Sequence, residues 1–145
     1  MSIDKFLSKE EESQIVQAIK AAEHRTSGEI RIHIESVCKG EVLDRAAWLF
    51  KSLKMHKTAL RNGVLIYLST TDRKFAIIGD AGINAVVPEG FWNDVKDLMI
   101  ANLSKGDPSQ GFVLGIARVG EKLKEFFPYQ EDDVNELPDE ISYGK

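Results

Sequence analysis

Cysteine is almost absent from this sequence, and its scarcity limits the chemistry open to the chain. The single cysteine, Cys38, cannot form a disulfide within the chain, and one cysteine is too few for a cysteine-rich zinc site. Cysteine-dependent phosphatases need the pattern Cys-x5-Arg, but Asp44 stands at the arginine position and Arg45 comes one place later. We therefore expect Cys38 to be a packed small residue and not a reactive thiol.

Long apolar segments are missing too. No apolar run exceeds that of Val64–Leu68, which is far shorter than the roughly 20 residues that a membrane-spanning helix needs. The first residues, MSIDKFLSKEEE, contain no apolar core of the kind that a secretory signal has. These features predict a soluble cytoplasmic protein with no membrane partner.

The chain also has no excess of positive charge. It contains 19 Lys and Arg residues against 23 Asp and Glu residues, and its net charge is −4. Residues 129–145 hold six of the acids and one lysine, which leaves 18 bases and 17 acids in residues 1–128. A nearly neutral body has no footprint for a nucleic-acid backbone, so no nucleic-acid partner is expected. We predict one domain over residues 1–128 and a flexible acidic tail over residues 129–145.

Helical periodicity is present in four parts of the chain. Ser8 and Glu11 match the Ser-x-x-Glu capping box, which satisfies backbone N–H groups at a helix start. The predicted helices cover residues 8–25, residues 41–55, a stretch after Pro88, and a stretch from 112 to 127 that Pro128 ends. Aromatic residues at or near core spacings are expected mainly in the interior: Trp48, Phe91, Trp92, Phe112, Phe126 and Phe127.

Two other apolar patterns predict three strands. EIRIHIES (29–36) alternates isoleucines with polar residues, which predicts one buried and one polar face, with His33 a solvated or hydrogen-bonded histidine at the surface. VLIYLST (64–70) is apolar nearly throughout, so we expect a central strand that is buried on both faces. KFAIIGD (74–80) follows a short turn, which makes the last two strands an antiparallel hairpin.

The order of these elements predicts the fold class. A helix separates the first two strands, so they are expected to be parallel and joined by a right-handed crossover. The full order is α-β-α-β-β-α-α. It predicts an α/β fold, a three-layer αβα sandwich with a small mixed sheet and helices on both faces.

Several stretches together resemble the TPM domain family over roughly residues 5–128. They are SGEIRIHIE, the segment from AAWLF to DAGIN, and the aromatic-bearing helix after Pro88; the most specific parts are RNGVLIYLS (61–69) and IGDAGIN (78–84). The resemblance implies an αβα sandwich that binds divalent cations, calcium especially, through acidic loop residues. The family includes a thylakoid-lumen protein tied to photosystem II repair, and acid phosphatase activity is associated with its plant branch. This chain resembles a short soluble bacterial-type member.

The strand directions bring polar residues to one edge of the predicted sheet. The first two strands start at this edge and the third strand ends there. Carboxylate and amide oxygens from Glu29, Asp80 and Asn84 would suit Ca²⁺ or Mg²⁺, and Asp94 could join them if its helix folds back. The other candidates, for a phosphate or for contacts behind the metal ligands, are Arg61, Asn62, Gly79 and Gly82; the glycines allow positive φ and close approach to a ligand. The alternative is an ordinary turn in which Arg61 pairs with Glu29 or Asp80 at the surface.

The opposite edge of the sheet is the second candidate. Ligands of open α/β sheets usually lie beyond the carboxyl ends of parallel strands. The predicted hairpin turn occupies that edge, however, and Asp72 is expected to be a turn residue. The residues expected there are Glu35, Ser36, Ser69, Thr70, Thr71 and Asp72.

Three functions follow from these patterns. The first is a domain that binds Ca²⁺ or Mg²⁺ and has a regulatory or accessory role. The second is a metal-dependent acid phosphatase that acts on phosphomonoesters, although the Asp-x-Asp, Arg-His-Gly and Gly-x4-Gly-Lys-Ser/Thr motifs of other phosphate enzymes are absent. The third is a protein-interaction module that uses the acidic tail.

Overall fold

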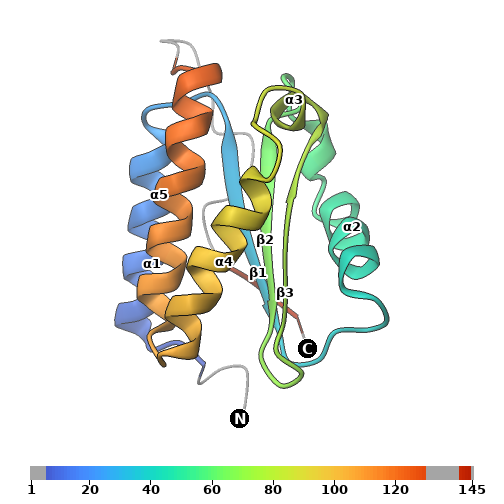
Figure 1. Ribbon diagram of the computed structural model, residues 1–145, viewed down its shortest axis with the longest axis vertical. Coiled ribbons are helices and arrows are strands. Elements are labelled where there is room, and N and C mark those ends of the chain that lie inside the picture. The colour runs from blue at the N-terminus through green and yellow to red at the C-terminus, as the bar shows by residue number, and fades with distance from the viewer. Residues whose placement is uncertain (1–5, 130–140, 145) are drawn as a thin grey trace.

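A four-stranded mixed sheet with helices on both faces forms the centre of the protein (Figure 1). The structure is a computed structural model that describes residues 6–129 and 141–144. The elements in chain order are α1 (Lys9–Glu23), β1 (Glu29–Glu35), α2 (Val42–Ser52), the short 3-10 helix η2 (Met55–Lys57), β2 (Gly63–Ser69), β3 (Lys74–Gly79), α3 (Ala81–Asn84), α4 (Phe91–Ser104), α5 (Pro108–Phe126) and β4 (Ser142–Tyr143).

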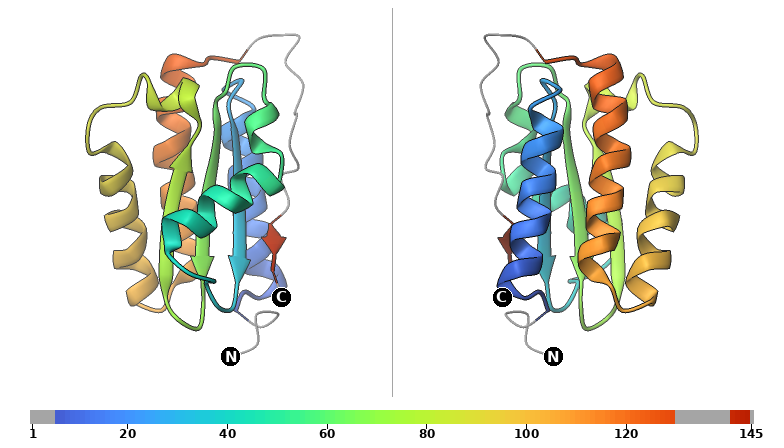
Figure 2. Two further views of the ribbon diagram at one scale, coloured as in Figure 1. Left: turned by 90° about the vertical axis from the view of Figure 1, so that its right-hand side faces the viewer. Right: turned by 90° about the vertical axis from the view of Figure 1, so that its left-hand side faces the viewer.

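The topology confirms the predicted α/β class. The strands lie in the order β3-β2-β1-β4; β1 and β2 are parallel, and β2 and β3 form the expected antiparallel hairpin. Figure 2 shows α2, followed by η2, across one face of the sheet, and α1 and α5 side by side on the other face with α4 beyond them. The arrangement is consistent with a three-layer sandwich. Within the described residues, no helix is both long and apolar enough to cross a bilayer.

Local signals in the sequence account for the helix starts. Ser8 and Glu11 form the predicted capping box on α1, with both reciprocal bonds present. Glu41 caps α2 by accepting from two backbone N–H groups. Pro108 occupies the first turn of α5, where a missing N–H costs nothing, and Asp107 caps that helix.

Two separate apolar clusters fill the two interfaces of the sheet. The larger cluster lies under α1, α4 and α5 and contains the β1 isoleucines at 30, 32 and 34. The smaller cluster lies under α2 and contains Leu65 and Tyr67 of β2 with Ala76 of β3. Strand β2 contributes to both clusters and is buried along its whole length, as its continuous apolar run predicts.

The prediction of a polar, solvated face on β1 is wrong. His33 and Glu35 are 4% and 2% exposed, because α2 covers this face and an arginine of α2 neutralises Glu35. Alternation shows which side chains share a face but not whether a helix covers that face. Trp48, expected in the core, is 59% exposed on the outer side of α2, where Arg45 packs over its ring.

Part of the predicted tail pairs with the sheet. Residues 142 and 143 form β4, which lies parallel to β1 beside residues 33 and 34. No pattern in the sequence indicates this strand, because two residues are too few to form one. Residues 130–140 lie outside the described residues, so the boundary at residue 128 and the flexibility of that segment stay predictions.

Candidate functional site

The centre of the predicted edge is an ion pair between Asp80 and Arg61. Arg61 Nε donates to Asp80 Oδ2 at 2.7 Å, and Nη2 donates to Oδ1 at 2.8 Å. The Asp80 side chain is only 6% exposed, whereas that of Arg61 is 51% exposed. Burial raises the pKa of Asp80, but hydrogen bonds from Arg61 and from the backbone N–H of Ala81 outweigh it and hold the pKa below its usual 3.8. Asp80 is therefore an ionised carboxylate that is covered by the more exposed side chain of Arg61.

Asp80 also starts a helical turn that the sequence did not predict. Its carboxylate accepts from the N–H of Ala81 at 2.7 Å, and it is the N-cap of α3. The stretch GDAGIN is thus a strand exit followed directly by one capped helical turn. Arg61 donates to both carboxylate oxygens, and the Ala81 N–H shares Oδ1 with Nη2, so departure of the guanidinium leaves the cap of α3 in place.

The backbone at Arg61 holds an unusual conformation. Its φ is 53°, in the left-handed region that side chains other than glycine seldom adopt. The carbonyl of Arg61 accepts from the N–H of Gly82 at 2.8 Å, and the N–H of Arg61 donates to the carbonyl of Thr58 at 3.2 Å. These bonds tie the loop before β2 to α3 and place the guanidinium over Asp80.

The two glycines of GDAGIN have a different role from the one predicted. Neither is among the residues with positive φ. A Cβ on Gly82 would lie 2.2 Å from the Leu60 carbonyl oxygen, and one on Gly79 would lie 2.5 Å from the Trp92 ring. The glycines are required for close approach, but to the protein's own backbone and side chains and not to a ligand.

Glu29, Gly63 and Asp80 lie in one row across the sheet, which brings Glu29 to the same face as Asp80. Gly63 pairs with Glu29 of β1, and its carbonyl accepts from the N–H of Asp80 at 2.9 Å. Both carboxylates therefore stand on the face covered by α2, two strands apart, and the residue between them in the row is the side-chain-free Gly63. Adjacent strands are about 4.8 Å apart, so the two Cα atoms are separated by roughly 10 Å. Glu29 itself is buried.

Asn84 and Asp94 do not join this arrangement. Asn84 Nδ2 donates to the Gly79 carbonyl at 2.7 Å, and Asn84 Oδ1 accepts from the indole of Trp92 at 2.8 Å. Asn84 thus ties α3 to the end of β3 through Nδ2 and to the first turn of α4 through Oδ1. Asp94 is exposed on α4. Among residues 6–129 and 141–144, no three His, Cys, Asp or Glu side chains are grouped so as to hold a metal ion.

A cavity of about 330 Å³ opens beside Asp80, between α2 and β3. Its wall contains Phe50 and Ile78 together with the basic residues Lys51, His56 and Arg61. The Nδ1 atom of His56 is buried and has no hydrogen-bond partner within the described part of the chain. Lys51 and His56 were not predicted as site residues, because only the packing of α2 and η2 against β3 brings them to this edge.

Asn62 lies at the same edge and is 1% exposed. Its backbone carbonyl accepts from the N–H of Glu29 at 3.3 Å, and its backbone N–H donates to Thr58 Oγ1 at 3.3 Å. The side-chain Nδ2 is buried without a partner in the described residues. Such an atom marks a place where a water molecule or a ligand oxygen would be accommodated.

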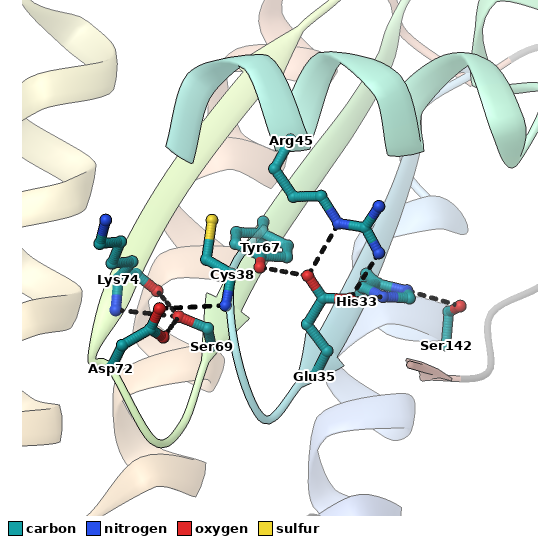
Figure 3. Close-up of polar contacts among 9 residues, drawn as sticks. All are labelled: His33, Glu35, Cys38, Arg45, Tyr67, Ser69, Asp72, Lys74 and Ser142. Atoms are coloured by element: carbon teal, nitrogen blue, oxygen red, sulfur yellow. Dashed lines mark hydrogen bonds and ion pairs between the residues drawn. The ribbon is translucent and has the colours of Figure 1, made fainter. Parts of the chain in front are cut away.

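The opposite edge contains a second arginine–carboxylate pair, which is buried (Figure 3). Arg45 Nε and Nη2 donate to Glu35 at 2.9 and 2.8 Å, and the Tyr67 hydroxyl donates to the same carboxylate. His33 Nε2 lies 3.4 Å from Glu35 Oε1, and its ring is stacked on that of Tyr67. The Arg45 side chain is only 16% exposed.

The pKa shifts at this edge follow from that arrangement. Burial raises the pKa of Glu35, but hydrogen bonds from Arg45 and Tyr67 outweigh it, so the net shift is downward. Burial lowers the pKa of His33, and the nearby Glu35 only partly opposes this. Burial and the bond to Glu35 raise the pKa of Tyr67. Glu35 is thus charged, His33 is neutral at pH 7, and Tyr67 remains a donor.

The hairpin turn at this edge supports the reading of Asp72 as a turn residue. Its carboxylate accepts from the Ser69 hydroxyl and, at 3.0 Å, from the backbone N–H of Cys38. Cys38 is buried, as expected for a packed small residue. The Asp72 carboxylate thus ties the hairpin turn to the loop after β1.

Comparison with known proteins gives one family and one architecture. The family model for the TPM domain matches residues 3–122. The solution structure of the BA42 protein from the psychrophilic bacterium Bizionia argentinensis is 46% identical, covers 99% of both chains and has a TM-score of 0.91. An N-terminal domain from P. gingivalis shares the fold at 19% identity, with a TM-score of 0.67 over 88% of this chain and 84% of that one. No curated protein matches the chain.

Proposed function

Given that this chain belongs to the TPM domain family, we propose that it binds Ca²⁺ or Mg²⁺ at Asp80 and has a regulatory or accessory role. One observation carries the proposal: a buried, ionised carboxylate is paired with an arginine side chain that is 51% exposed. Arg61 can therefore move into water at little cost. A divalent cation would then take the place of the guanidinium.

The energetics favour such an exchange. The exposed guanidinium of Arg61 is screened by solvent, which weakens its hold on Asp80. A divalent ion carries twice the charge of the guanidinium and contacts the oxygens directly. Asp80 would keep its bond to Ala81 N–H during the exchange, so α3 would remain capped.

The donor set is small, and it predicts weak binding. Asp80 supplies one carboxylate, and Glu29 supplies a second across the side-chain-free Gly63. Asn84 is left out because its oxygen accepts from Trp92. Asp94 is left out because it is exposed on α4. A shell completed by water predicts a dissociation constant of about 10⁻⁴ to 10⁻³ M, in the range of low-affinity calcium modules.

Backbone amide spectra recorded during titration with CaCl₂ and MgCl₂ test this proposal. Localised, saturable shifts are expected at residues 29, 61–63 and 79–82. Asp80→Asn should abolish them while keeping the acceptor that caps α3, and Asp94→Asn is the matched control that should leave them unchanged. Equal responses from the two variants, or no response in the wild-type chain, would refute the proposal.

The cavity beside Asp80 favours a second candidate function, hydrolysis of phosphomonoesters. Lys51, His56 and Arg61 line it, and the unpartnered His56 Nδ1 could meet a phosphoryl oxygen. A bound divalent ion would activate water and neutralise the phosphate charge. Turnover of a generic aryl phosphate measures this activity directly. Arg61→Met separates the two functions, because it should strengthen cation binding but weaken phosphate binding.

A further inference from the structure

The outer edge of β1 is occupied by a very short strand. β4 covers only residues 33 and 34 of the seven-residue β1. The contact continues to Gly144, whose N–H donates to the Ile34 carbonyl at 2.8 Å. Farther along the same edge, the N–H of Ile30 donates to the Glu23 carboxylate at 2.9 Å and not to another strand. The edge is therefore only partly paired within the described residues, which is the usual setting for addition of a strand.

Two side-chain features make the edge of β1 at residues 33–35 selective for the strand that pairs with it. The Ser142 hydroxyl is hydrogen-bonded to His33 Nδ1 at 2.9 Å, as Figure 3 shows. At residue 144, a Cβ would lie 2.7 Å from both Cβ and Oε1 of Glu35 and 3.1 Å from His33 Nε2. Glu35 cannot yield easily, because Arg45 and Tyr67 hold its carboxylate. This edge of β1 thus accepts a segment that has a hydroxyl side chain at one position and glycine two positions later.

From these contacts we propose that the edge of β1 at residues 33–35 is a recognition site for an extended peptide. Its ligand is a segment with serine or threonine followed two positions later by glycine, bound parallel to β1. Residues 142–144 of this chain are the resident occupant and compete with such a ligand. This inference concerns the end of the sheet opposite Asp80 and does not depend on cation binding.

The resident strand β4 pairs with only two residues of β1, which makes its displacement feasible. A partner segment that pairs with more of β1 than two residues forms additional backbone hydrogen bonds. The resident has the advantage of being tethered, which gives it an effective concentration of about 1 mM or more. Partner binding to the intact chain is consequently weak, and it becomes stronger once the resident segment is prevented from docking.

The test uses the full chain, the full chain with Gly144→Ala, and two fluorescent peptides. One peptide has the sequence of residues 139–145, and the other is the same peptide with Gly144→Ala. The unmodified peptide should bind the Gly144→Ala chain about tenfold more tightly than it binds the wild-type chain, because the tethered competitor is weakened. The altered peptide should bind neither chain.

Amide spectra of both chains supply the second measurement. Gly144→Ala should shift the signals of Ile34 and Glu35, and the unmodified peptide should return them toward their wild-type positions. Equal peptide affinity for the two chains, equal affinity for the two peptides, or shifts confined to other parts of the sheet would overturn the proposal. Unchanged signals in the Gly144→Ala chain would overturn it as well, because the resident would then not be held as described.

Discussion

Two arginine–carboxylate pairs lie on one face of the sheet, at its opposite ends, and they differ in their access to water. Glu35 is held by Arg45, whose side chain is 16% exposed, and by the Tyr67 hydroxyl. Asp80 is held by Arg61, whose side chain is 51% exposed, and by one backbone N–H. The geometry of the two forks is nearly the same, with N–O distances from 2.7 to 2.9 Å.

The difference separates a structural pair from an exchangeable one. Removing one partner of a buried pair leaves an uncompensated charge, which is strongly destabilising. Removing a half-exposed arginine opens its carboxylate to water instead, so the cost is small. By this criterion Glu35 fastens α2 to the sheet, whereas Asp80 is available to a ligand.

The largest effect is expected from removal of the buried guanidinium. Arg45→Met keeps most of the apolar stem but leaves Glu35 charged and buried. We expect the free energy of unfolding to fall by about 3 kcal/mol, the lower end of the range for broken buried pairs, because Tyr67 and His33 still contact Glu35. Urea denaturation followed by circular dichroism measures it. A loss below 1 kcal/mol would mean that the pair is not structural.

A smaller loss is expected at the turn that positions the exposed pair. Gly82→Ala places a Cβ 2.2 Å from the Leu60 carbonyl oxygen, and backbone must move to relieve the overlap. We expect a loss of about 2 kcal/mol, as for other overpacked sites, with shifts in the amide signals of Arg61 and Asp80. The same denaturation measurement applies. Full stability in this variant would show that the loop before β2 and α3 are not locked together.

The matched change at the exposed pair should have little effect on stability. Arg61→Met removes a guanidinium, as Arg45→Met does. The backbone strain at residue 61 stays the same, because methionine disfavours a positive φ as arginine does. We expect a clearly smaller loss of stability than in Arg45→Met, because solvent screens the exposed guanidinium of Arg61. If the two methionine variants were equally destabilised, the distinction between the pairs would fail.

The smallest effect concerns acid pH. The folded pKa of Glu35 lies below its usual 4.5, so its stabilisation is complete above pH 4.5 and is lost as pH falls through the folded value. Glu35→Gln removes this contribution, so the stability gap between variant and wild type should narrow as pH falls below 4.5. Denaturation at a series of pH values from 7 to 3 shows it. A stability difference that stays constant over this pH range would contradict a stabilising role for the ionised Glu35 carboxylate.

The sequence was sufficient for the three strands β1 to β3 and for the placing of Arg61 and Asp80 at one edge, because both depend on strand direction and connection length. It was insufficient for the interior of the site. The requirement for glycine at position 82 arises from the Leu60 carbonyl, and the burial of His33 and Glu35 arises from α2. Strand β4 pairs with residues more than a hundred positions away. Such contacts come from tertiary packing and have no local signature.

One measurement tests the exchangeable pair most directly: the calcium affinity of Arg61→Met against that of the wild-type chain, from amide shifts at residues 79–82. If the guanidinium competes with the ion for Asp80, its removal should tighten calcium binding by up to about fivefold, as expected for the loss of a solvent-screened competitor. Unchanged or weaker binding in Arg61→Met, or shifts centred on the turn at Asp72, would contradict the assignment of Asp80 as the cation ligand.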